Sequence, residues 1–436
     1  MTLHIEYLNT KTIKPYKQNP RIHKSKQIAQ IAQSIQTFAF NNPLLIDEKN
    51  EIIAGHGRWL AAQQLQLKEV PVIQLLHLSE AQKKAYRIAD NKLTENGQWD
   101  VDLLKLEFLD LETLDLEFNL DITGFDIADI DLILDEHLAD KHTPLDEQAN
   151  AVPFVPDHEI VTILGDIWLL GKHKIICGDA ILPQTYQALC QDKKASMVFT
   201  DPPYNVKVDG HIGGLGKIKH KEFQMASGEM SSAEFQDFLQ KNFTLLKAFS
   251  KNGSLHYICM DWRHIKEIIE AGTAVYDDFK NLCVWNKDNG GMGSLYRSKH
   301  ELVFVFKHGN RSHHNNVELG SHGRYRTNVW DYPGVNSFGG DKDKLKMHPT
   351  VKPVEMVKDA ILDVSARGEI ILDAFLGSGT TLIAAEQCGR ICYGIELEPL
   401  YVDTTIRRWQ EISGQSAIHQ ATGKTYRELG EEKVHD

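Results

Sequence analysis

The sequence predicts an α/β protein, with a parallel sheet and helices in its C-terminal part and a smaller α+β segment before it. Short, mostly apolar runs at 196–200 and 369–372 end in polar or glycine-rich loops, which is typical of buried parallel strands. The second run is followed by an alanine-rich helix and another apolar run at 391–395, so a βαβ unit is expected. Apolar residues make up 42% of the chain and charged residues 25%, which indicates a globular protein with a sizeable core.

Length and cysteine content bound the organisation of the chain. At about 150 residues per domain, 436 residues correspond to roughly three domains. No apolar run reaches the roughly 18 residues of a membrane span, and the N-terminus lacks a signal-peptide pattern, so we expect a cytoplasmic protein with no membrane partner. The six cysteines contain no Cys-x-x-Cys pair, and the histidines within 308–322 lie among Gly, Asn and Ser. We therefore expect reduced, buried thiols and no metal site.

The acidic charge of the chain is confined to one segment. The net charge is −12, but residues 101–150 hold fifteen acidic and two basic side chains, which leaves the remainder close to neutral. Nucleic-acid binding is therefore excluded only for that segment, because phosphate contacts need Lys and Arg. We predict an acidic, partly helical linker at 96–155, with docking of a partner or mimicry of DNA as the alternative.

The N-terminal segment predicts alternating helices and strands. Helical spacing of apolar residues indicates a helix over 26–37, and two short apolar runs at 44–46 and 52–54 predict a hairpin. Gly55 to Arg58 then forms a glycine turn that opens a helix and offers backbone N–H groups to an anion. A strand at 70–76 and a helix capped by Ser79 complete the segment.

This order, with Asn19-Pro20-Arg21 ahead of the first helix, resembles the ParB-like domain of chromosome-partition proteins over residues 4–95. We therefore predict a ParB-like domain at 1–95. The resemblance implies a nucleotide-phosphate site at the turn, with Gly55 and Arg58 as its residues. Because Gly57 stands where related turns carry a second arginine, a module kept for packing or DNA contact is the alternative.

The apolar run at 196–200 is followed directly by the tetrapeptide Asp201-Pro202-Pro203-Tyr204. Ligands of open α/β sheets bind at the carboxyl ends of the strands. Two successive prolines restrict the backbone, so the Asp201 carboxylate and the Pro202 carbonyl are presented as fixed acceptors beside the ring of Tyr204. Two acceptors and a stacking ring suit an exocyclic amino group on a planar base.

A second loop, Asp373 to Thr381, follows the strand 369–372. It has no lysine, which excludes a P-loop, and Leu382 stands where a dinucleotide-binding loop has its third glycine. The following strand ends in Glu396, placed to accept from ribose hydroxyls. The loop therefore predicts a nucleoside site without a pyrophosphate requirement, which fits S-adenosylmethionine.

Four segments resemble, in their order along the chain, the motifs of the permuted (β-class) DNA amino-methyltransferases, and the resemblance spans residues 160–412. These segments are the tetrapeptide at 201–204, the tripeptide Asn328-Val329-Trp330, residues 348–353 and the loop at 373–381. The resemblance implies a Rossmann-like, seven-stranded, S-adenosyl-L-methionine-dependent methyltransferase sheet, and we assign it residues 156–436. It makes Asp201, Pro202, Pro203 and Tyr204 catalytic, with no metal. It also implies these cofactor-binding residues: Asp179, Thr350, Lys352, Asp373, Phe375, Gly377, Gly379, Thr380 and Glu396. For Asp179, a strand-end cap is the alternative.

The resemblance implies site-specific methylation of double-stranded DNA, of the restriction-modification type. The target base must be flipped out of the duplex to reach the pocket. Adenine N6 is the predicted target, because Asp in the tetrapeptide is the commoner adenine form. The alternatives are cytosine N4, or a nucleotide-gated DNA-binding regulator with a vestigial methylase half. A target-recognition region is expected at about 287–347, and the predicted DNA contacts are Lys207, Lys217, Lys219, Lys221, Arg297, Arg324 and Arg326.

Overall fold

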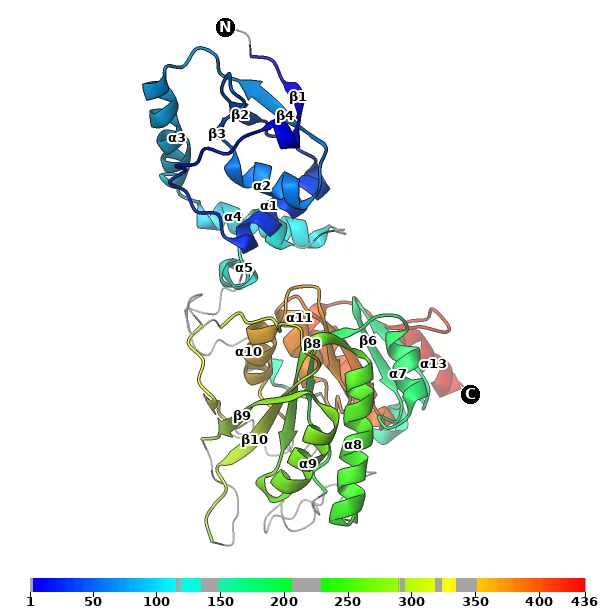
Figure 1. Ribbon diagram of the computed structural model, residues 1–436. Coiled ribbons are helices and arrows are strands. Elements are labelled where there is room, and N and C mark those ends of the chain that lie inside the picture. Colours follow the sequence, from blue (N-terminus) through cyan, green and yellow to red (C-terminus); the bar gives the residue numbers. More distant parts are fainter. Residues whose placement is uncertain are drawn as a thin grey trace. The chain divides into compact units, whose positions relative to one another are not determined.

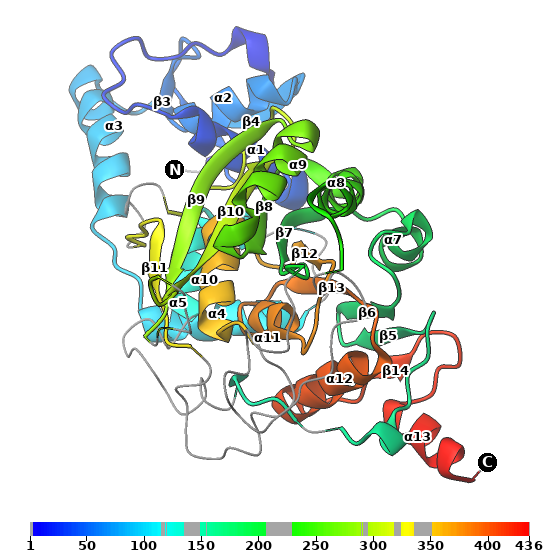
Figure 2. The same ribbon diagram turned by 90° about the horizontal axis from the view of Figure 1, so that it is seen from below.

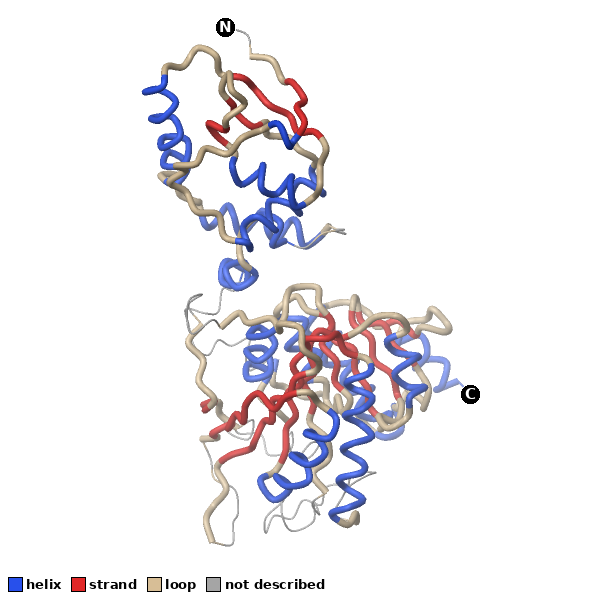
Figure 3. The backbone as a smooth tube through the Cα atoms, viewed as in Figure 1, coloured by secondary structure: helices blue, strands red, loops and turns tan. Residues whose placement is uncertain are grey.

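The computed structural model describes residues 3–114, 118, 120–134, 149–153, 155–205, 229–288, 290, 295–317, 324–334 and 351–435. The chain forms two compact units, Met1–Glu136 and His137–Asp436, each built on its own sheet (Figure 1, Figure 3). This division differs from the predicted boundaries at 95 and 155, because part of the segment predicted as a linker folds with the first unit.

The first unit contains a four-stranded sheet in the order β1-β4-β2-β3. The predicted hairpin is present as the antiparallel pair β2 and β3, and β4 lies parallel to β2 and antiparallel to β1. Alternating apolar residues form its core, and Ile46, Ile52 and Val72 are fully buried. The strands are β1 Glu6–Asn9, β2 Leu44–Ile46, β3 Ile52–Ala54 and β4 Glu69–Gln74.

The predicted helices of this unit are confirmed as α1 Ser25–Phe38, α2 His56–Gln64 and α3 Glu80–Glu95, after a short 3-10 turn η1 at Thr10–Thr12. Ser79 begins α3 with a capping box, in which its hydroxyl accepts from the Gln82 N–H. Two buried cations of α3 hold it on the hairpin: Lys83 pairs with Glu48 at 2.8 Å and Arg87 with Glu51 at 3.1 Å.

The acidic segment folds into α4 Val101–Thr113, η2 Leu120–Thr123 and α5 Ile127–Leu134. Its helical content was expected, but its packing was not. Phe108 is 2% exposed and its ring lies 5.6 Å from that of Phe125, while Lys26 of α1 pairs with Asp126 at 2.9 Å. These contacts bury apolar residues whose role a count of charged residues does not show. The acidic segment therefore packs as part of the first unit.

The second unit is built on a mixed sheet, in which the described residues form ten strands in the order β11-β9-β10-β8-β7-β12-β13-β6-β5-β14. The strands β6, β13, β12, β7 and β8 are parallel to one another, and β10 runs antiparallel to β8 and β9. Their bounds are β5 Ile167–Leu170, β6 His173–Cys177, β7 Ala195–Thr200, β8 Ser250–Met260, β9 Asp278–Asn286, β10 His300–Lys307, β11 Val329–Asp331, β12 Ile370–Asp373, β13 Ile391–Glu396 and β14 Ile418–His419.

The seven strands from β9 to β6 form the centre of this sheet and confirm the implied fold class. Three further strands extend its edges: β11 beside β9, and β5 with β14 beyond β6. These edge strands have two to four residues, too few to show a period of two in the sequence. β11 contains Val329 and Trp330 of the Asn328-Val329-Trp330 motif.

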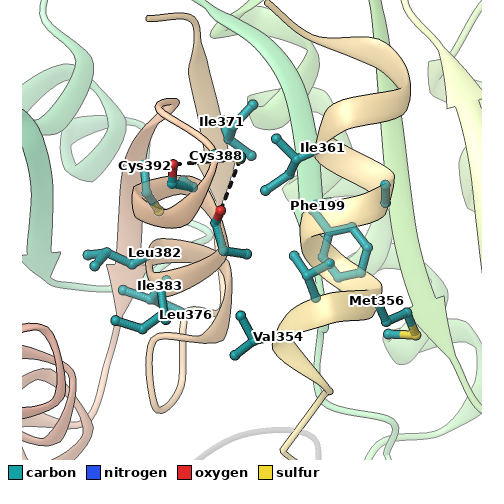
Figure 4. Close-up of a cluster of buried hydrophobic side chains, with 14 of the residues drawn as sticks. Phe199, Val354, Met356, Ile361, Ile371, Leu376, Leu382, Ile383, Cys388 and Cys392 are labelled. Atoms are coloured by element: carbon teal, nitrogen blue, oxygen red, sulfur yellow. Dashed lines mark hydrogen bonds between the residues drawn. The ribbon is translucent and has the colours of Figure 1, made fainter. Parts of the chain in front are cut away.

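Helices cover both faces of the sheet (Figure 2). One face carries α7 Pro183–Cys190, α8 Ser232–Ala248 and α9 Ile265–Val275, and the other carries α10 Val354–Val364, α11 Thr380–Gln387 and α12 Pro399–Ser413. Figure 4 shows Val354 and Ile361 of α10 packed near Phe199 of β7 and Leu382 of α11. The 3-10 turns η4 Asp157–Glu159 and η5 Trp262–His264 and the final helix α13 Tyr426–His435 complete the unit.

All six cysteines are free and buried, as predicted. None of the helices in the described ranges is long and apolar enough to cross a membrane. Within the same ranges, no group of three or more His, Cys, Asp or Glu side chains could hold a metal ion.

Candidate active site

The polar residues singled out in the sequence meet at one edge of the second sheet. Because β6, β7, β12 and β13 are parallel, the residues at or just beyond their carboxyl ends share that edge. These residues are Asp179, Asp201, Phe375 and Glu396. The antiparallel strand β10 begins at the same edge, since Leu302 is paired with Met260 at the end of β8, and this brings Glu301 to the site.

The loop after β12 is closely packed around two glycines. Gly377 and Gly379 both adopt left-handed backbone conformations, with φ of 54° and 85°. A Cβ atom on Gly379 would lie 2.6 Å from Cγ2 of Thr405, and the Thr405 hydroxyl donates to the Gly377 carbonyl at 3.0 Å. The loop therefore has no room for a side chain at Gly379.

Asp373, the last residue of β12, directs its carboxylate into the protein. Its Oδ1 accepts from the hydroxyl of Thr200 at 2.8 Å and from the Phe375 N–H at 3.0 Å, and its Oδ2 accepts from Thr381 at 2.6 Å. Burial raises the pKa of Asp373 to about 6, although these three donors oppose the rise. Asp373, predicted among the cofactor residues, is placed to shape the loop.

Glu396, at the end of β13, reaches the same loop. Its Oε2 accepts from the Gly377 N–H at 2.8 Å and its Oε1 from the Glu398 N–H at 2.9 Å. Burial raises the pKa of Glu396 to about 7, and Asp373 contributes to the rise while the backbone donors oppose it. A buried carboxylate at the glycine loop is a suitable acceptor for ribose hydroxyls.

The remaining cofactor candidates frame this loop. Asp179 accepts from the Ile181 N–H at 3.0 Å, which is the strand-end capping role given above as its alternative. Phe375 is partly buried, with its ring 6.0 Å from that of Phe238 in α8. Thr380 begins α11, is 8% exposed and accepts from Arg408 at 3.5 Å.

The tetrapeptide is embedded in a network of buried charges. The hydroxyl of Tyr204 donates to Oδ1 of Asp201 at 2.5 Å, and Lys352 Nζ donates to Oδ2 of Asp201 at 2.5 Å. Lys352 also lies 3.2 Å from the Tyr204 hydroxyl and 3.1 Å from Oε2 of Glu301. Lys287 pairs with Oε1 of Glu301. The side chain of Lys352 is 5% exposed, that of Glu301 11% and that of Asp201 24%, so Asp201 is the most accessible of these three.

The charged groups in this network shift one another's pKa. Burial raises the pKa of Asp201, and Glu301 adds to that rise, while Lys352 and Tyr204 oppose it. Burial alone would lower the pKa of Lys352, but Asp201 and Glu301 outweigh it and raise the pKa. Burial would likewise raise the pKa of Glu301, which Lys352 and Lys287 lower instead. Lys352 is therefore an ammonium held between two carboxyl groups.

The other predicted site residues have different outcomes. Thr350 and the four lysines predicted to contact DNA, Lys207, Lys217, Lys219 and Lys221, lie outside the described residues. Lys352, predicted to approach the methionine end of the cofactor, contacts the tetrapeptide. Arg297 is exposed and donates to the Gly290 carbonyl at 2.6 Å.

The predicted DNA contacts by Arg324 and Arg326 do not fit their placement. The side chain of Arg324 is 6% exposed and donates to Asp363 at 2.8 Å and to Asp359 at 3.1 Å. Arg326 donates to Asp363 and to Asp359 and lies over the ring of Trp330. Both guanidinium groups neutralise carboxylates of α10, so they hold the β11 segment on that helix.

In the first unit, the glycine turn from Gly55 to Arg58, predicted as an anion site, has a left-handed glycine and opens a helix, as expected. Gly55 has φ of 101° and precedes α2, which begins without a side-chain cap. Arg58 lies against Gly55 and donates to the Asn42 carbonyl at 2.8 Å. Burial lowers the pKa of Arg58, while the distant charge of Asp90 opposes the change.

Sequence reasoning missed Glu301 and Lys287. The signal for Glu301 is an acidic residue directly before the apolar run 302–306. That signal could not be interpreted, because the sequence does not show that β10 runs against its neighbours and therefore starts, rather than ends, at the site.

Three family models match successive parts of the chain. A DNA methylase model matches residues 195–407, a ParB N-terminal domain model matches residues 2–92, and a ParB-methyltransferase HTH domain model matches residues 102–162. The third match covers the acidic segment that folds as α4, η2 and α5.

Curated relatives match the two parts separately. The N-terminal part is 49% identical over 82 residues to the ParB-like nuclease domain-containing protein YnaK of Escherichia coli (strain K12), covering 19% of this chain and 94% of YnaK. The C-terminal part is 28% identical over 239 residues to the type II methyltransferase M2.MboI of Moraxella bovis, covering 51% of this chain and 83% of that enzyme.

Two solved structures are similar to the C-terminal part. One is the M1.HpyAVI–SAM complex, at 20% identity and a TM-score of 0.38, covering 54% of this chain and 98% of that one. The other is the cytosine-N4-specific PvuII DNA methyltransferase, at 14% identity and a TM-score of 0.42, covering 61% and 92%. Residues 195–407 of this chain therefore form a domain of the DNA methylase family, and a ParB N-terminal domain and a ParB-methyltransferase HTH domain precede it.

Proposed function

We propose that this protein transfers a methyl group from S-adenosyl-L-methionine to the exocyclic amino group of a flipped base in double-stranded DNA, with adenine N6 as the target. One observation carries the proposal: the Asp201 tetrapeptide and the glycine loop follow neighbouring parallel strands, and Thr200 and Asp373 at the ends of those strands are joined by a 2.8 Å hydrogen bond. The acceptors for an amino group therefore stand beside a nucleoside loop.

The loop residues fit the cofactor. A Cβ on Gly379 would meet Thr405, so the loop backbone packs closely against α12, and Glu396 offers a partly buried carboxylate for the ribose. Phe375, Gly377 and Thr380 line the same loop. When bound, the cofactor supplies an electrophilic methyl group on a sulfonium sulfur.

The tetrapeptide orients the base. The Asp201 carboxylate and the Pro202 carbonyl accept from the two N–H bonds of the amino group, which directs its lone pair toward the methyl group. Tyr204 provides a ring on which the flipped base stacks, and flipping is needed because the amino group is not reachable inside a duplex. Alignment of the two reactants supplies most of the rate acceleration. As the nitrogen–methyl bond forms, the methyl–sulfur bond would break and leave its electron pair on a neutral thioether sulfur, and the nitrogen would then release a proton to solvent.

Adenine N6 is the proposed target because the tetrapeptide begins with Asp201, the form commoner among adenine enzymes of the resembling class. Cytosine N4 is the second candidate. The lysines between 207 and 221, together with Arg297, are proposed to contact DNA phosphates, and the region 287–347 to recognise the target sequence.

The ParB N-terminal domain is proposed to bind a nucleotide at the turn of Gly55 and Arg58. The left-handed Gly55 and the uncapped start of α2 leave the first backbone N–H groups of that helix available to a phosphate. Titration of a nucleotide into the wild-type protein and into Arg58→Ala, with the heat of binding measured by calorimetry, tests the proposed nucleotide site. Binding by wild type that is lost in the variant is expected, and equal heats in both contradict it.

Transfer of tritiated methyl groups from S-adenosyl-L-methionine to plasmid DNA tests the methylation directly. We expect incorporation by the wild-type protein and none by Asp201→Ala, while both proteins bind the cofactor equally. Equal incorporation by the two proteins would contradict the role of Asp201.

A further inference from the structure

Both carboxylate oxygens of Asp201 already accept hydrogen bonds from protein donors. Oδ1 accepts from the Tyr204 hydroxyl and Oδ2 from the Lys352 ammonium, each at 2.5 Å. The proposed chemistry requires the amino nitrogen of the base as the donor to Asp201. Lys352 Nζ, which is also a nitrogen donor, stands in that place. A carboxylate oxygen can accept more than one hydrogen bond, but the ammonium holds Oδ2 at 2.5 Å, so an amino group that approaches Oδ2 competes with Lys352 for it.

Glu301 is positioned to remain paired with Lys352 when Lys352 moves away from Asp201. Its Oε2 lies 3.1 Å from Lys352 Nζ and 3.3 Å from the Tyr204 hydroxyl, so it already contacts both donors of Asp201. A buried ammonium that lost its carboxylate partner would be strongly destabilised. With Glu301 present, Lys352 can leave Asp201 and remain paired.

The orientation of Glu301 is itself fixed. Lys287, just beyond β9, pairs with Oε1, which leaves Oε2 directed at Lys352. Lys287 in turn lies over the ring of Trp285, 4.4 Å from its centre. The two lysines and the two carboxylates Asp201 and Glu301 form a neutral group, so a neutral base can enter without adding an unpaired charge.

We propose that Glu301 is a positioning residue for Asp201: it retains Lys352 when the base enters the pocket, and so frees Oδ2 of Asp201 for the exocyclic amino group. This inference rests on the proposed function, because it concerns the same pocket. The step exchanges hydrogen bonds and neither makes nor breaks a covalent bond.

The substitution Glu301→Gln tests it, because the amide keeps the shape of Glu301 and removes the charge that balances Lys352. Lys352 should then stay on Asp201. We expect kcat/KM for DNA to fall about tenfold or more, as for the loss of a hydrogen bond to a charged group, with unchanged affinity for S-adenosyl-L-methionine. The single-turnover rate of methyl transfer to a duplex that contains the target found by modification sequencing should fall by a similar factor.

The double variant Glu301→Gln/Lys352→Met separates positioning from a structural role. Without the ammonium, Oδ2 of Asp201 is free for the amino group, so the single-turnover rate should return toward the wild-type value. A structural defect at Glu301 would not be relieved by a second substitution. Glu301→Asp, which keeps the charge, should fall between wild type and Glu301→Gln.

Glu386→Gln serves as the matched control. Glu386 accepts from His173 and Trp409 at 2.6 and 2.9 Å on α11, and His173 begins β6, at the opposite edge of the sheet. This variant should show the wild-type single-turnover rate. A wild-type rate in Glu301→Gln, or an equal loss of rate in the single and double variants, would overturn the inference. A wild-type protein that methylates no DNA would contradict the proposed function itself, and the inference with it.

Discussion

The hydroxyl of Thr200 donates to the carboxylate of Asp373 at 2.8 Å, and it accepts in turn from the N–H of Ala374 at 3.2 Å. Thr200 is the last residue of β7 and Asp373 the last of β12. The two loops that carry the candidate chemistry are far apart in the sequence, and this pair fixes their separation where they meet. Neither residue needs to touch a ligand for the site to depend on them.

Thr200→Val should destabilise the protein. The substitution preserves the shape of the side chain and removes both hydrogen bonds, which leaves Asp373 with one donor fewer in a buried position. We expect the free energy of unfolding in urea to fall by about 1–3 kcal/mol. Thr200→Ser, which keeps the hydroxyl, should lose less, and equal stability of Thr200→Val and wild type would contradict this role.

Cofactor binding should release a proton from Glu396. Its pKa of about 7 means that the carboxyl group is partly protonated at neutral pH, and ribose hydroxyls that donate to it favour the ionised form. Affinity for S-adenosyl-L-methionine should therefore rise between about pH 6 and 8. Calorimetry in buffers of different ionisation enthalpy measures the proton directly.

The Glu396→Gln variant should bind the cofactor more weakly and without this pH dependence. In the unliganded protein, the raised pKa of Glu396 stabilises the folded state fully below about pH 4.5, and the effect is lost as the pH rises through about 7. A variant that kept the wild-type pH dependence of binding would show that another group releases the proton.

Gly379→Ala should weaken cofactor binding. The residue has φ of 85°, and its new Cβ would lie 2.6 Å from Thr405, so the loop must shift. Gly414→Ala is the matched control, because Gly414 also has a positive φ, 69°, but nothing lies within 4 Å of a Cβ there. Backbone strain of about 1–2 kcal/mol is expected in both variants, and loss of cofactor affinity in Gly379→Ala alone. Equal affinities would contradict the packing argument.

The exposed Arg297 and the buried Arg324 should respond differently to substitution. Arg297→Ala should lower DNA affinity and reduce the dependence of log K on log salt by about one, with no change in stability. Arg324→Ala leaves Asp363, a buried carboxylate, with one partner fewer, and should lower the free energy of unfolding by about 3–5 kcal/mol. Titrations of DNA at several salt concentrations and urea unfolding of both variants distinguish these effects. A stable Arg324→Ala variant would contradict the structural role.

Most of the elements that carry the site were predictable from the sequence. The strand before Asp201, the loop at 373–381 and the strand ending at Glu396 each follow from a local apolar run and its boundary residues. Their meeting at one edge follows from their being parallel, which the βαβ pattern indicates.

The charge network around Asp201 was not predictable, because its members come from strands and loops whose direction is set by the whole sheet. Glu301 reaches the site only because β10 is antiparallel. Arg324 and Arg326 resemble DNA contacts in the sequence because a count of basic residues does not show their partners on α10, Asp359 and Asp363. The acidic segment resembles a linker in the sequence because its many charged residues outnumber its few buried apolar residues, such as Phe108.

Long-read modification sequencing of DNA from a methylase-free host tests the central claim most directly. The host should express either the wild-type chain or Asp201→Ala, both confirmed as folded. We predict a sequence motif carrying N6-methyladenine with the wild-type chain and no modified motif with the variant. N4-methylcytosine would correct the base but keep the chemistry. The absence of any modified motif with the wild-type chain would contradict the claim that this protein methylates DNA.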